Sequence, residues 1–342
     1  MRFISTLFAA AFGMACVAGA EAQTAPTGPA LGQALAAGQI DAASFDFGAL
    51  RYTPGKTLAF LAAESAAQGA IAQAHGKPNW PAISASHVCL SPAERLTVAG
   101  FDSALVAPDA QAWAADKAQA EAAYARYDAA RDAILAGQST PYPEFAAEAQ
   151  MVAAAASARQ PELKALYLHK AADALWRRAL VFGGARSYAE GVGKAGVIWL
   201  NARVTNEGCA VDAAAAQWLK TTLATVSWFD IKTYGKAADE AAWLIAEHAD
   251  ADPDVQLLAL DRMGQRVIDH QSDPGAFAYL WDRVALNTGR PQRYGTQMHC
   301  IGAAWGLVSP VEDVAKLDER RGWVGLGPEA EFIRKGQKAC GG

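Results

Sequence analysis

The stretch "QAWAADKAQAEAAYARYDAARDAILAGQ", residues 111–138, decides the fold class because its large side chains recur with a helical period. Six residues fall on one stripe of such a helix, namely Trp113, Ala120, Tyr124, Tyr127, Ala130 and Ile134. Residues spaced in this way form the buried face of an amphipathic helix. Gly137 stands where a helix C-cap is expected, because glycine adopts the left-handed conformation at low cost. The stretch therefore predicts a long helix that ends near residue 137.

The same period recurs along most of the chain. It predicts further helices near residues 56–75, 142–158, 161–181, 188–203, 210–227 and 237–249. Aspartate–proline pairs at 252–253 and 273–274 are typical helix starts, and Ser309 with Pro310 and Glu312 makes a full capping-box signal. No alternating run is long enough to indicate a sheet, and no repeat has a fixed period. We therefore expect an all-α protein, an irregular array of antiparallel helix pairs with little or no sheet.

The composition changes along the 342-residue chain. Alanine dominates residues 23–150, whereas eight of the ten tryptophans lie from Trp176 onward. We expect three segments: a signal peptide over residues 1–22, an alanine-rich helical region over 23–160 and a tryptophan-rich helical domain over 161–342.

The N-terminus, "MRFISTLFAAAFGMACVAGAEA", has the three parts of an export signal. Arg2 supplies the basic region, an apolar run follows to about Ala18, and Ala20-Glu21-Ala22 offers a small-x-small cleavage pattern. We expect cleavage after Ala22. No later segment is apolar for long enough to cross a bilayer. The sequence therefore predicts a periplasmic or secreted protein with no membrane span in its mature form.

The charge balance excludes one class of partner. The chain carries 30 Lys and Arg against 35 Asp and Glu, a net charge of −5. Binding to phosphate backbones needs clustered basic residues, so no nucleic-acid partner is expected.

The cysteines indicate an oxidising compartment. Once Cys16 leaves with the signal peptide, four remain, namely Cys89, Cys209, Cys300 and Cys340. An even number favours two disulfides, with all three pairings open; buried free thiols are the alternative. Their spacing matches no zinc motif, and neither a metal nor a cofactor is expected.

The stretch "RPQRYGTQMHC", residues 290–300, crowds hydrogen-bonding side chains around one glycine. This composition is typical of a loop rather than of an amphipathic helix or a half-buried strand. Glutamine amides both donate and accept, and arginine binds carboxylate or phosphate in two-point fashion. The ligand-binding candidates here and nearby are Arg283, Gln292, Tyr294, Thr296, Gln297, Asp318, Arg320 and Arg321. The alternative is a buried polar network that only fixes helix packing.

His248 is the candidate acid or base, with Asp282 as a second catalytic candidate. Ala241, Ile245 and His248 follow the i, i+4, i+7 rule, so the histidine shares the apolar face of its helix. Taken alone, this position is explained better by a core histidine that hydrogen-bonds a neighbouring backbone. The catalytic interpretation depends on the ordinary histidine pKa near neutrality.

A literal G-x-G-x-x-G occurs at Gly191, Gly193 and Gly196. A dinucleotide site needs a preceding strand and a following βαβ unit, and the flanking residues predict helix or loop. We expect no nucleotide site here.

Over roughly residues 165–338 the chain resembles an uncharacterised bacterial family, a domain of unknown function with a Tyr-Gly-Thr-Gln signature and a closing D-x-R-R signature. The residues that carry the resemblance are Asp173, Arg177, Tyr234, Gly235, Trp243, His248, Asp250, Gln256, Asp282, Arg283, Gln292, Tyr294, Gly295, Thr296, Gln297, Asp318, Arg320 and Arg321. Glu247 stands where a glutamine is more usual. The resemblance implies that these polar residues form one shared constellation, and it implies no reaction.

Three functional hypotheses follow. The first is an exported protein that binds a small polar or anionic ligand in a pocket built around the 290–300 loop. The second is a hydrolase or lyase that uses His248 as general acid or base. The third is a structural envelope protein whose polar cluster only fixes helix packing. The sequence decides neither whether the protein is an enzyme nor its oligomeric state.

Overall fold

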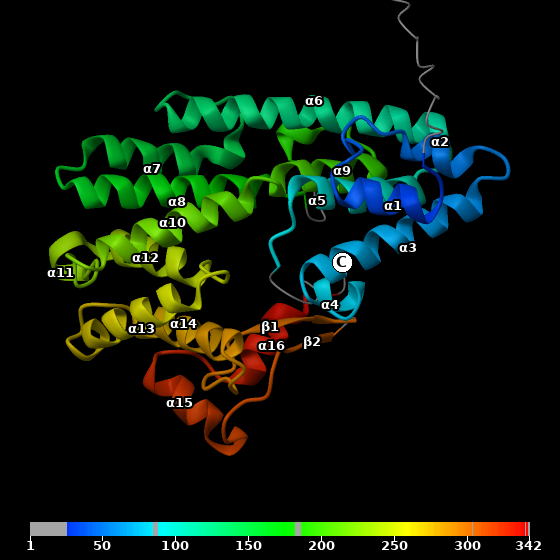
Figure 1. Ribbon diagram of the computed structural model, residues 1–342. Coiled ribbons are helices and arrows are strands. Elements are labelled where there is room, and N and C mark those ends of the chain that lie inside the picture. Colours follow the sequence, from blue (N-terminus) through cyan, green and yellow to red (C-terminus); the bar gives the residue numbers. More distant parts are fainter. Residues whose placement is uncertain (1–25, 85–87, 182–185, 303, 339, 341–342) are drawn as a thin grey trace, which may run out of the picture.

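The computed structural model describes residues 26–342 apart from 85–87, 182–185, 303, 339 and 341–342. The expected signal peptide lies outside the described residues. Almost every element is a helix, and the described residues contain one small two-stranded sheet (Figure 1). The prediction of an all-α fold is therefore confirmed. No helix in the described part of the chain is both long and apolar enough to cross a membrane.

The N-terminal region contains six α-helices. They are α1 (Pro29–Ala36), α2 (Phe47–Tyr52), α3 (Thr57–Ala74), α4 (Trp80–Ser84), α5 (Pro92–Val106) and α6 (Ala110–Leu135). The long helix predicted from residues 111–138 is α6, and it ends as expected. Gly137 takes a left-handed φ of 78°, and its N–H donates to the carbonyl of Ile134.

The middle of the chain stacks beneath α6 (Figure 1). It comprises η1 (Pro143–Phe145), α7 (Ala146–Ser157), α8 (Pro161–Ala179), η2 (Ser187–Ala189), α9 (Lys194–Thr205) and α10 (Gly208–Thr222). The helix expected over 188–203 starts later than predicted, because Gly191 has a positive φ of 82° and interrupts the chain before α9.

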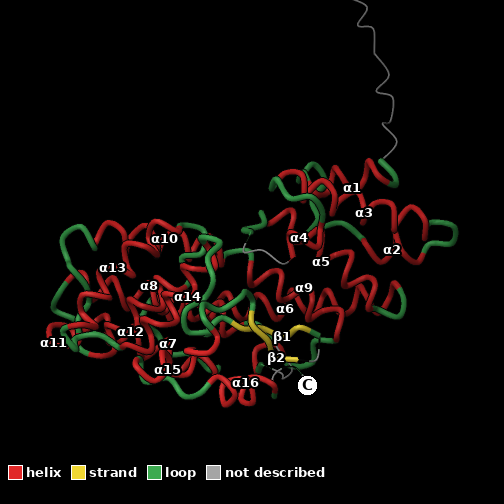
Figure 2. Tube along the Cα trace, turned by 90° about the horizontal axis from the view of Figure 1, so that it is seen from below, coloured by secondary structure: helices red, strands yellow, loops and turns green. Residues whose placement is uncertain are grey.

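The C-terminal part continues the stack. It comprises α11 (Ile231–Tyr234), α12 (Lys236–Glu247), α13 (Pro253–Ile268), α14 (Pro274–Asn287), β1 (Met298–Ile301), β2 (Ala304–Leu307), η3 (Val314–Lys316), α15 (Leu317–Trp323) and α16 (Glu329–Gln337). In the view from below, the N-terminal helices lie on one side, α10 to α15 on the other, and the hairpin lies between them (Figure 2).

Two apolar clusters form most of the core. The first gathers side chains from α1 to α9, such as Tyr127 and Trp199. The second gathers side chains from α8 to α14, such as the fully buried Trp228. Helix α8 belongs to both, since Leu175 packs in the first cluster and Leu166 in the second. Helix α8 therefore contributes to both halves of the core.

Helix starts follow the capping signals at two of the three predicted places. Asp252 and Asp273 each accept a hydrogen bond from the first turn of the helix that follows, α13 and α14. The signal at Ser309 is wrong. That segment is extended, because Gln292 donates its N–H to the carbonyl of Pro310 and accepts one from the N–H of Glu312. A backbone paired in this way cannot also form the first turn of a helix.

The hairpin corrects a second prediction. Residues 298–301 form strand β1 rather than loop, and β1 pairs antiparallel with β2. Most of its residues are exposed, so no alternation between a buried and a solvated face exists to reveal the strand. The hairpin is tied to the C-terminal tail by a disulfide between Cys300 and Cys340. Cys89 and Cys209 form the other disulfide, so the prediction of two bridges is confirmed.

The G-x-G-x-x-G stretch serves helix packing. A Cβ atom at Gly193 would lie 2.2 Å from Asp116 Oδ1, and one at Gly196 would lie 2.6 Å from the carbonyl oxygen of Asp116. Gly196 therefore lets α9 approach the backbone of α6 closely, and Gly193 leaves room for the Asp116 carboxylate.

We predict that Gly196→Ala destabilises the protein by about 1–3 kcal/mol, because the new methyl group overlaps a backbone carbonyl that cannot rotate away. The matched control is Gly69→Ala in α3, where a Cβ meets open space. That substitution should stabilise by about 0.5–1 kcal/mol through helix propensity. Urea denaturation followed by circular dichroism measures both, and equal stabilities would contradict the account.

Candidate functional site

A cavity of about 540 Å³ lies where the two halves of the molecule meet. Its walls come from α8, from α10, from the turn between α12 and α13, and from the residues that precede α5. The lining residues are Val88, Cys89, Trp176, Arg177, Cys209, Asp212, Ala213, Ala216, Gln217, His248, Ala249, Asp250, Ala251 and Asp252. The Cys89–Cys209 disulfide thus closes one wall. This volume suits a small molecule.

His248 enters the cavity beside a buried carboxylate. It is the C-cap residue of α12, and its Nδ1 lies 2.8 Å from Asp173 Oδ1 on α8. Asp173 is only 1% exposed and also accepts hydrogen bonds from Arg177 Nε at 2.8 Å and Lys170 Nζ at 3.3 Å. Within the described residues, no group hydrogen-bonds the other ring nitrogen, Nε2, and that atom is not sealed inside the protein. His248 therefore presents Nε2 to the cavity.

The charges around Asp173 define the protonation of this pair. Burial raises the pKa of Asp173, but the hydrogen bond and charge of His248, with Arg177 and Lys170, outweigh burial and leave that pKa below its usual value. Burial lowers the pKa of His248, and Asp173 offsets this only in part. At neutral pH we therefore expect an ionised Asp173 and a neutral His248. Such a carboxylate orients the ring by accepting the proton on Nδ1, which leaves Nε2 basic.

Asp212, on α10, also lines the cavity. Arg177 bridges the two acids, since its Nη2 lies 2.8 Å from Asp212 Oδ2 while its Nε bonds Asp173. Burial is the main reason that the pKa of Asp212 rises to about 6, and the nearby charge of Asp173 adds to the rise. The guanidinium of Arg177 also sits 4.1 Å from the ring centre of Trp176, which fixes its orientation. The cavity therefore holds a basic nitrogen and a carboxyl group that is partly protonated near pH 6.

The loop at 290–297 has a different character. Asp282 on α14 is fully buried, and its carboxylate accepts the backbone N–H groups of Arg293, Tyr294 and Thr296. It also accepts the hydroxyl of Thr296 at 2.8 Å. Burial raises the pKa of Asp282 although these hydrogen bonds lower it. One side chain thus holds the whole loop against α14.

The two glutamines complete this loop network. Gln292 is fully buried; its Nε2 donates to the carbonyls of Gln297 and Ser309, and its Oε1 accepts the N–H of Gln297. The Nε2 of Gln297 donates to Glu247 Oε1 at 3.0 Å and to the carbonyl of Tyr279 at 3.3 Å. These amides are therefore engaged with the protein itself.

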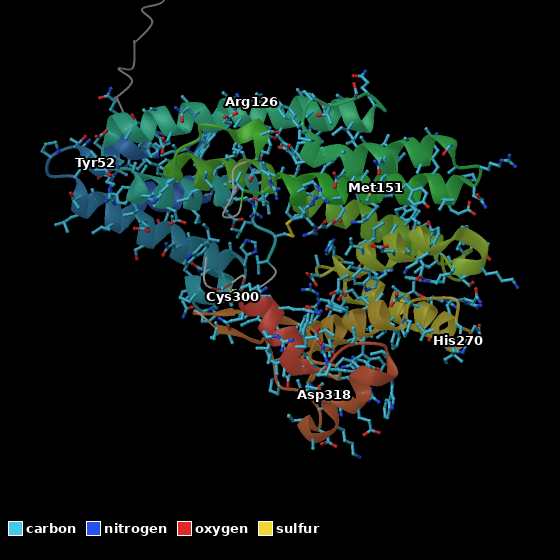
Figure 3. The ribbon with its side chains drawn as sticks, turned by 180° about the vertical axis from the view of Figure 1, so that it is seen from behind. Tyr52, Arg126, Met151, His270, Cys300 and Asp318 are labelled. Carbon is cyan, nitrogen blue, oxygen red and sulfur yellow. A yellow bond between two sulfur atoms is a disulfide. The ribbon has the colours of Figure 1, made fainter. Side chains whose placement is uncertain are left out.

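The arginines of the closing signature are also bound to backbone. Arg320 donates to the carbonyls of Arg293, Glu312 and Asp313, and Arg321 donates to those of Gly327, Tyr294 and Gly295. Both side chains belong to residues no more than 5% exposed. Asp318 lies apart, at the outer end of the molecule on α15, where it accepts the N–H of Glu329 (Figure 3).

The structure therefore divides the predicted constellation in two. His248 lines the cavity. The other residues belong to the buried loop or bind it, and none of them lines the cavity; they are Asp282, Gln292, Tyr294, Thr296, Gln297, Arg320 and Arg321. Arg283 lies between the groups, with Nε 3.1 Å from Glu247 Oε1 and Nη1 3.7 Å from Asp250 Oδ2. Spacing alone did not single out Asp212, because its helix reads as an ordinary alanine-rich segment. Asp173 and Arg177 entered only through the family resemblance.

The comparisons with known proteins agree with part of that resemblance. Residues 186–342 match the sequence model of a family of unknown function, DUF6624. Neither the curated proteins nor the solved structures gave a match to the chain. The C-terminal part is thus similar to an uncharacterised domain family, and the match begins after α8, so Asp173 and Arg177 precede it.

We predict that Asp282→Asn destabilises the protein by about 2–4 kcal/mol, because an amide turns a donor toward buried N–H groups and strands them. Glu319→Gln, at an exposed position of α15, is the control and should change stability by less than about 0.5 kcal/mol. Chemical denaturation measures both. Equal effects would mean that the carboxylate does not hold the loop.

Glu247 gives a prediction about pH. The residue is 5% exposed, and burial raises its pKa above the ordinary glutamate value even though Arg283 lowers it. The folded protein then binds this proton more tightly than the unfolded chain does. The free energy of unfolding should therefore fall as pH rises from about 4.5 through the raised pKa. Glu247→Gln should remove this dependence, which denaturation series at several pH values would detect; an unchanged slope would contradict the prediction.

Proposed function

We propose that the cavity beside His248 binds a small polar molecule, and that the Asp173–His248 pair performs acid–base chemistry on it, as in a hydrolase or lyase. The supporting observation is the 2.8 Å contact between His248 Nδ1 and the buried, cation-paired Asp173, with Nε2 left on the cavity side. A neutral imidazole whose Nδ1 proton is held by an ionised carboxylate leaves Nε2 able to accept a proton.

Each residue has a defined task in this proposal. His248 Nε2 takes a proton from a water molecule or from the substrate, and the Asp173 carboxylate stabilises the imidazolium that forms. Asp212, in its protonated state, donates a proton to the leaving group. Arg177 holds both carboxyl groups in place and offers its cationic edge to the ligand. General acid–base catalysis of this kind contributes on the order of 10²–10⁴-fold in rate.

The proposed ligand site is the cavity beside His248 and not the 290–300 loop that the sequence predicted. Loop side chains bond one another and the backbone, so a ligand there would have to displace existing hydrogen bonds. The residues that line the cavity include three aspartates and one arginine, namely Asp212, Asp250, Asp252 and Arg177. A neutral polar ligand suits these walls better than the anion that the arginines first suggested.

We also propose that the protein is exported to the periplasm or secreted. The signal-like N-terminus and the two disulfides support this, because structural disulfides persist in oxidising compartments.

The test uses p-nitrophenyl acetate, an activated ester that a cavity-bound basic imidazole hydrolyses without a specific substrate pocket. The wild-type protein should exceed the rate of free imidazole at equal concentration, and His248→Asn should lose about 100-fold or more. His299→Asn, on the exposed hairpin, is the matched control and should retain the wild-type rate. Melting temperatures of all three proteins show that each is folded.

The outcomes separate the hypotheses. Equal rates in wild type and His248→Asn would contradict the acid–base proposal. If the wild-type protein shows no hydrolysis and His248→Asn lowers only the melting temperature, the pair is part of the packing instead.

A further inference from the structure

The turn that carries His248 is held by side chains from α13 and α14. Gln256 on α13 donates to the carbonyls of Ala246 and Glu247 at 3.3 and 3.4 Å, and to Asp250 Oδ1 at 3.3 Å. Asn287 on α14 donates to Asp250 Oδ1 at 2.9 Å and to Gln256 Oε1 at 2.7 Å. Gln256 is fully buried. The backbone before the histidine and the Asp250 side chain after it are therefore fixed by side chains from two neighbouring helices.

Arg283 contacts the residues at both ends of the 247–250 turn. Its Nε bonds Glu247, the residue before His248, at 3.1 Å, and its Nη1 lies 3.7 Å from Asp250, two residues after it. The side chain of Arg283 is 20% exposed, and those of its partners are 6% and 19% exposed. Ion pairs in such surroundings are screened less than pairs on the surface.

We propose that Arg283 is a positioning residue of the His248 site: it holds the 247–250 turn through Glu247 and Asp250, and its charge balances Asp250 on the cavity wall. This inference rests on the proposed function, since it assigns a task to a residue that touches neither the cavity nor the reacting nitrogen.

The electrostatic part of the proposal follows from the charges that face His248. They are Lys170, Asp173 and Arg177 from α8, Asp212 from α10, and Glu247, Asp250 and Asp252 from its own turn and the helix start that follows. Arg283→Met removes the positive charge that lies 3.1 Å from Glu247 and 3.7 Å from Asp250. Loss of a positive charge near the imidazole favours its protonated form, so the pKa of His248 should rise and the neutral base should become scarcer.

The same contacts link the loop to the site. Glu247 Oε1 accepts hydrogen bonds from both Arg283 and Gln297, and Gln297 belongs to the network around Gln292. The buried loop thereby orients Glu247, which in turn orients the guanidinium of Arg283. A role in positioning explains why so many polar side chains gather at a loop that lines no part of this cavity.

The experiment measures the pKa of His248 by NMR titration of its ring signals, which are assigned by comparison with His248→Asn. Arg283→Met should raise this pKa by roughly 0.5 or more. Asp250→Asn in the Arg283→Met background should return it toward the wild-type value, because this second substitution removes a negative charge from the same turn. Arg283→Lys, which keeps the charge, should remain close to the wild type.

Arg320→Met is the matched control for packing. Arg320 belongs to the same loop network but bonds only backbone carbonyls, so its loss should lower stability without changing the pKa of His248. If Arg283→Met also leaves this pKa unchanged, the positioning role is overturned. If Arg283→Met does not fold, Arg283→Gln and Arg283→Lys are compared instead, and equal pKa values in the two overturn it. The ester assay with His248→Asn tests the proposed function separately, because the titration requires no catalysis.

Discussion

The hydrogen bonds and ion pairs of Asp173 are the constraint on which the centre of this molecule depends. A carboxylate with 1% exposure would be costly to bury alone, and it is compensated by Lys170, Arg177 and His248. Lys170 and Arg177 belong to α8, the helix shared by both apolar clusters, and His248 ends α12 in the second cluster. The same interaction thus joins α8 to the C-terminal helices and fixes the orientation of the imidazole.

The loop network follows the same principle on a second carboxylate. Asp282 gathers three backbone N–H groups and a hydroxyl, which gives residues 293–296 a defined shape without helix or strand. The arginines of α15 close the opposite side by binding the carbonyls of the loop. Polar groups buried in this way must all be satisfied, which makes such a network rigid and sensitive to single substitutions. Arg283 lies between this rigid region and the cavity.

The sequence predicted the fold class and most helices, because helical periodicity and aspartate–proline caps are local signals. The cysteine count favoured two disulfides but left their pairing open. It failed at Ser309, where local capping chemistry competes with backbone pairing to Gln292, a residue 17 positions earlier that no local rule includes. The polar residues of 282–297 were recognised as a group, but spacing could not decide whether their side chains face a ligand or one another. Asp212 was missed because a single acid among alanines gives no signal until α8 brings Arg177 beside it. The predicted domain boundary between residues 160 and 161 stays a prediction. Helix α8, which follows it, contributes side chains to both apolar clusters.

The central claim is that His248 is a neutral base whose Nδ1 proton is held by Asp173. Long-range nitrogen–proton NMR correlation on the wild-type protein at neutral pH reports directly which ring nitrogen carries the proton. The account predicts the tautomer protonated on Nδ1, with Nε2 unprotonated and a pKa below 6.5. A ring protonated on Nε2, or one that is doubly protonated at neutral pH, would contradict it.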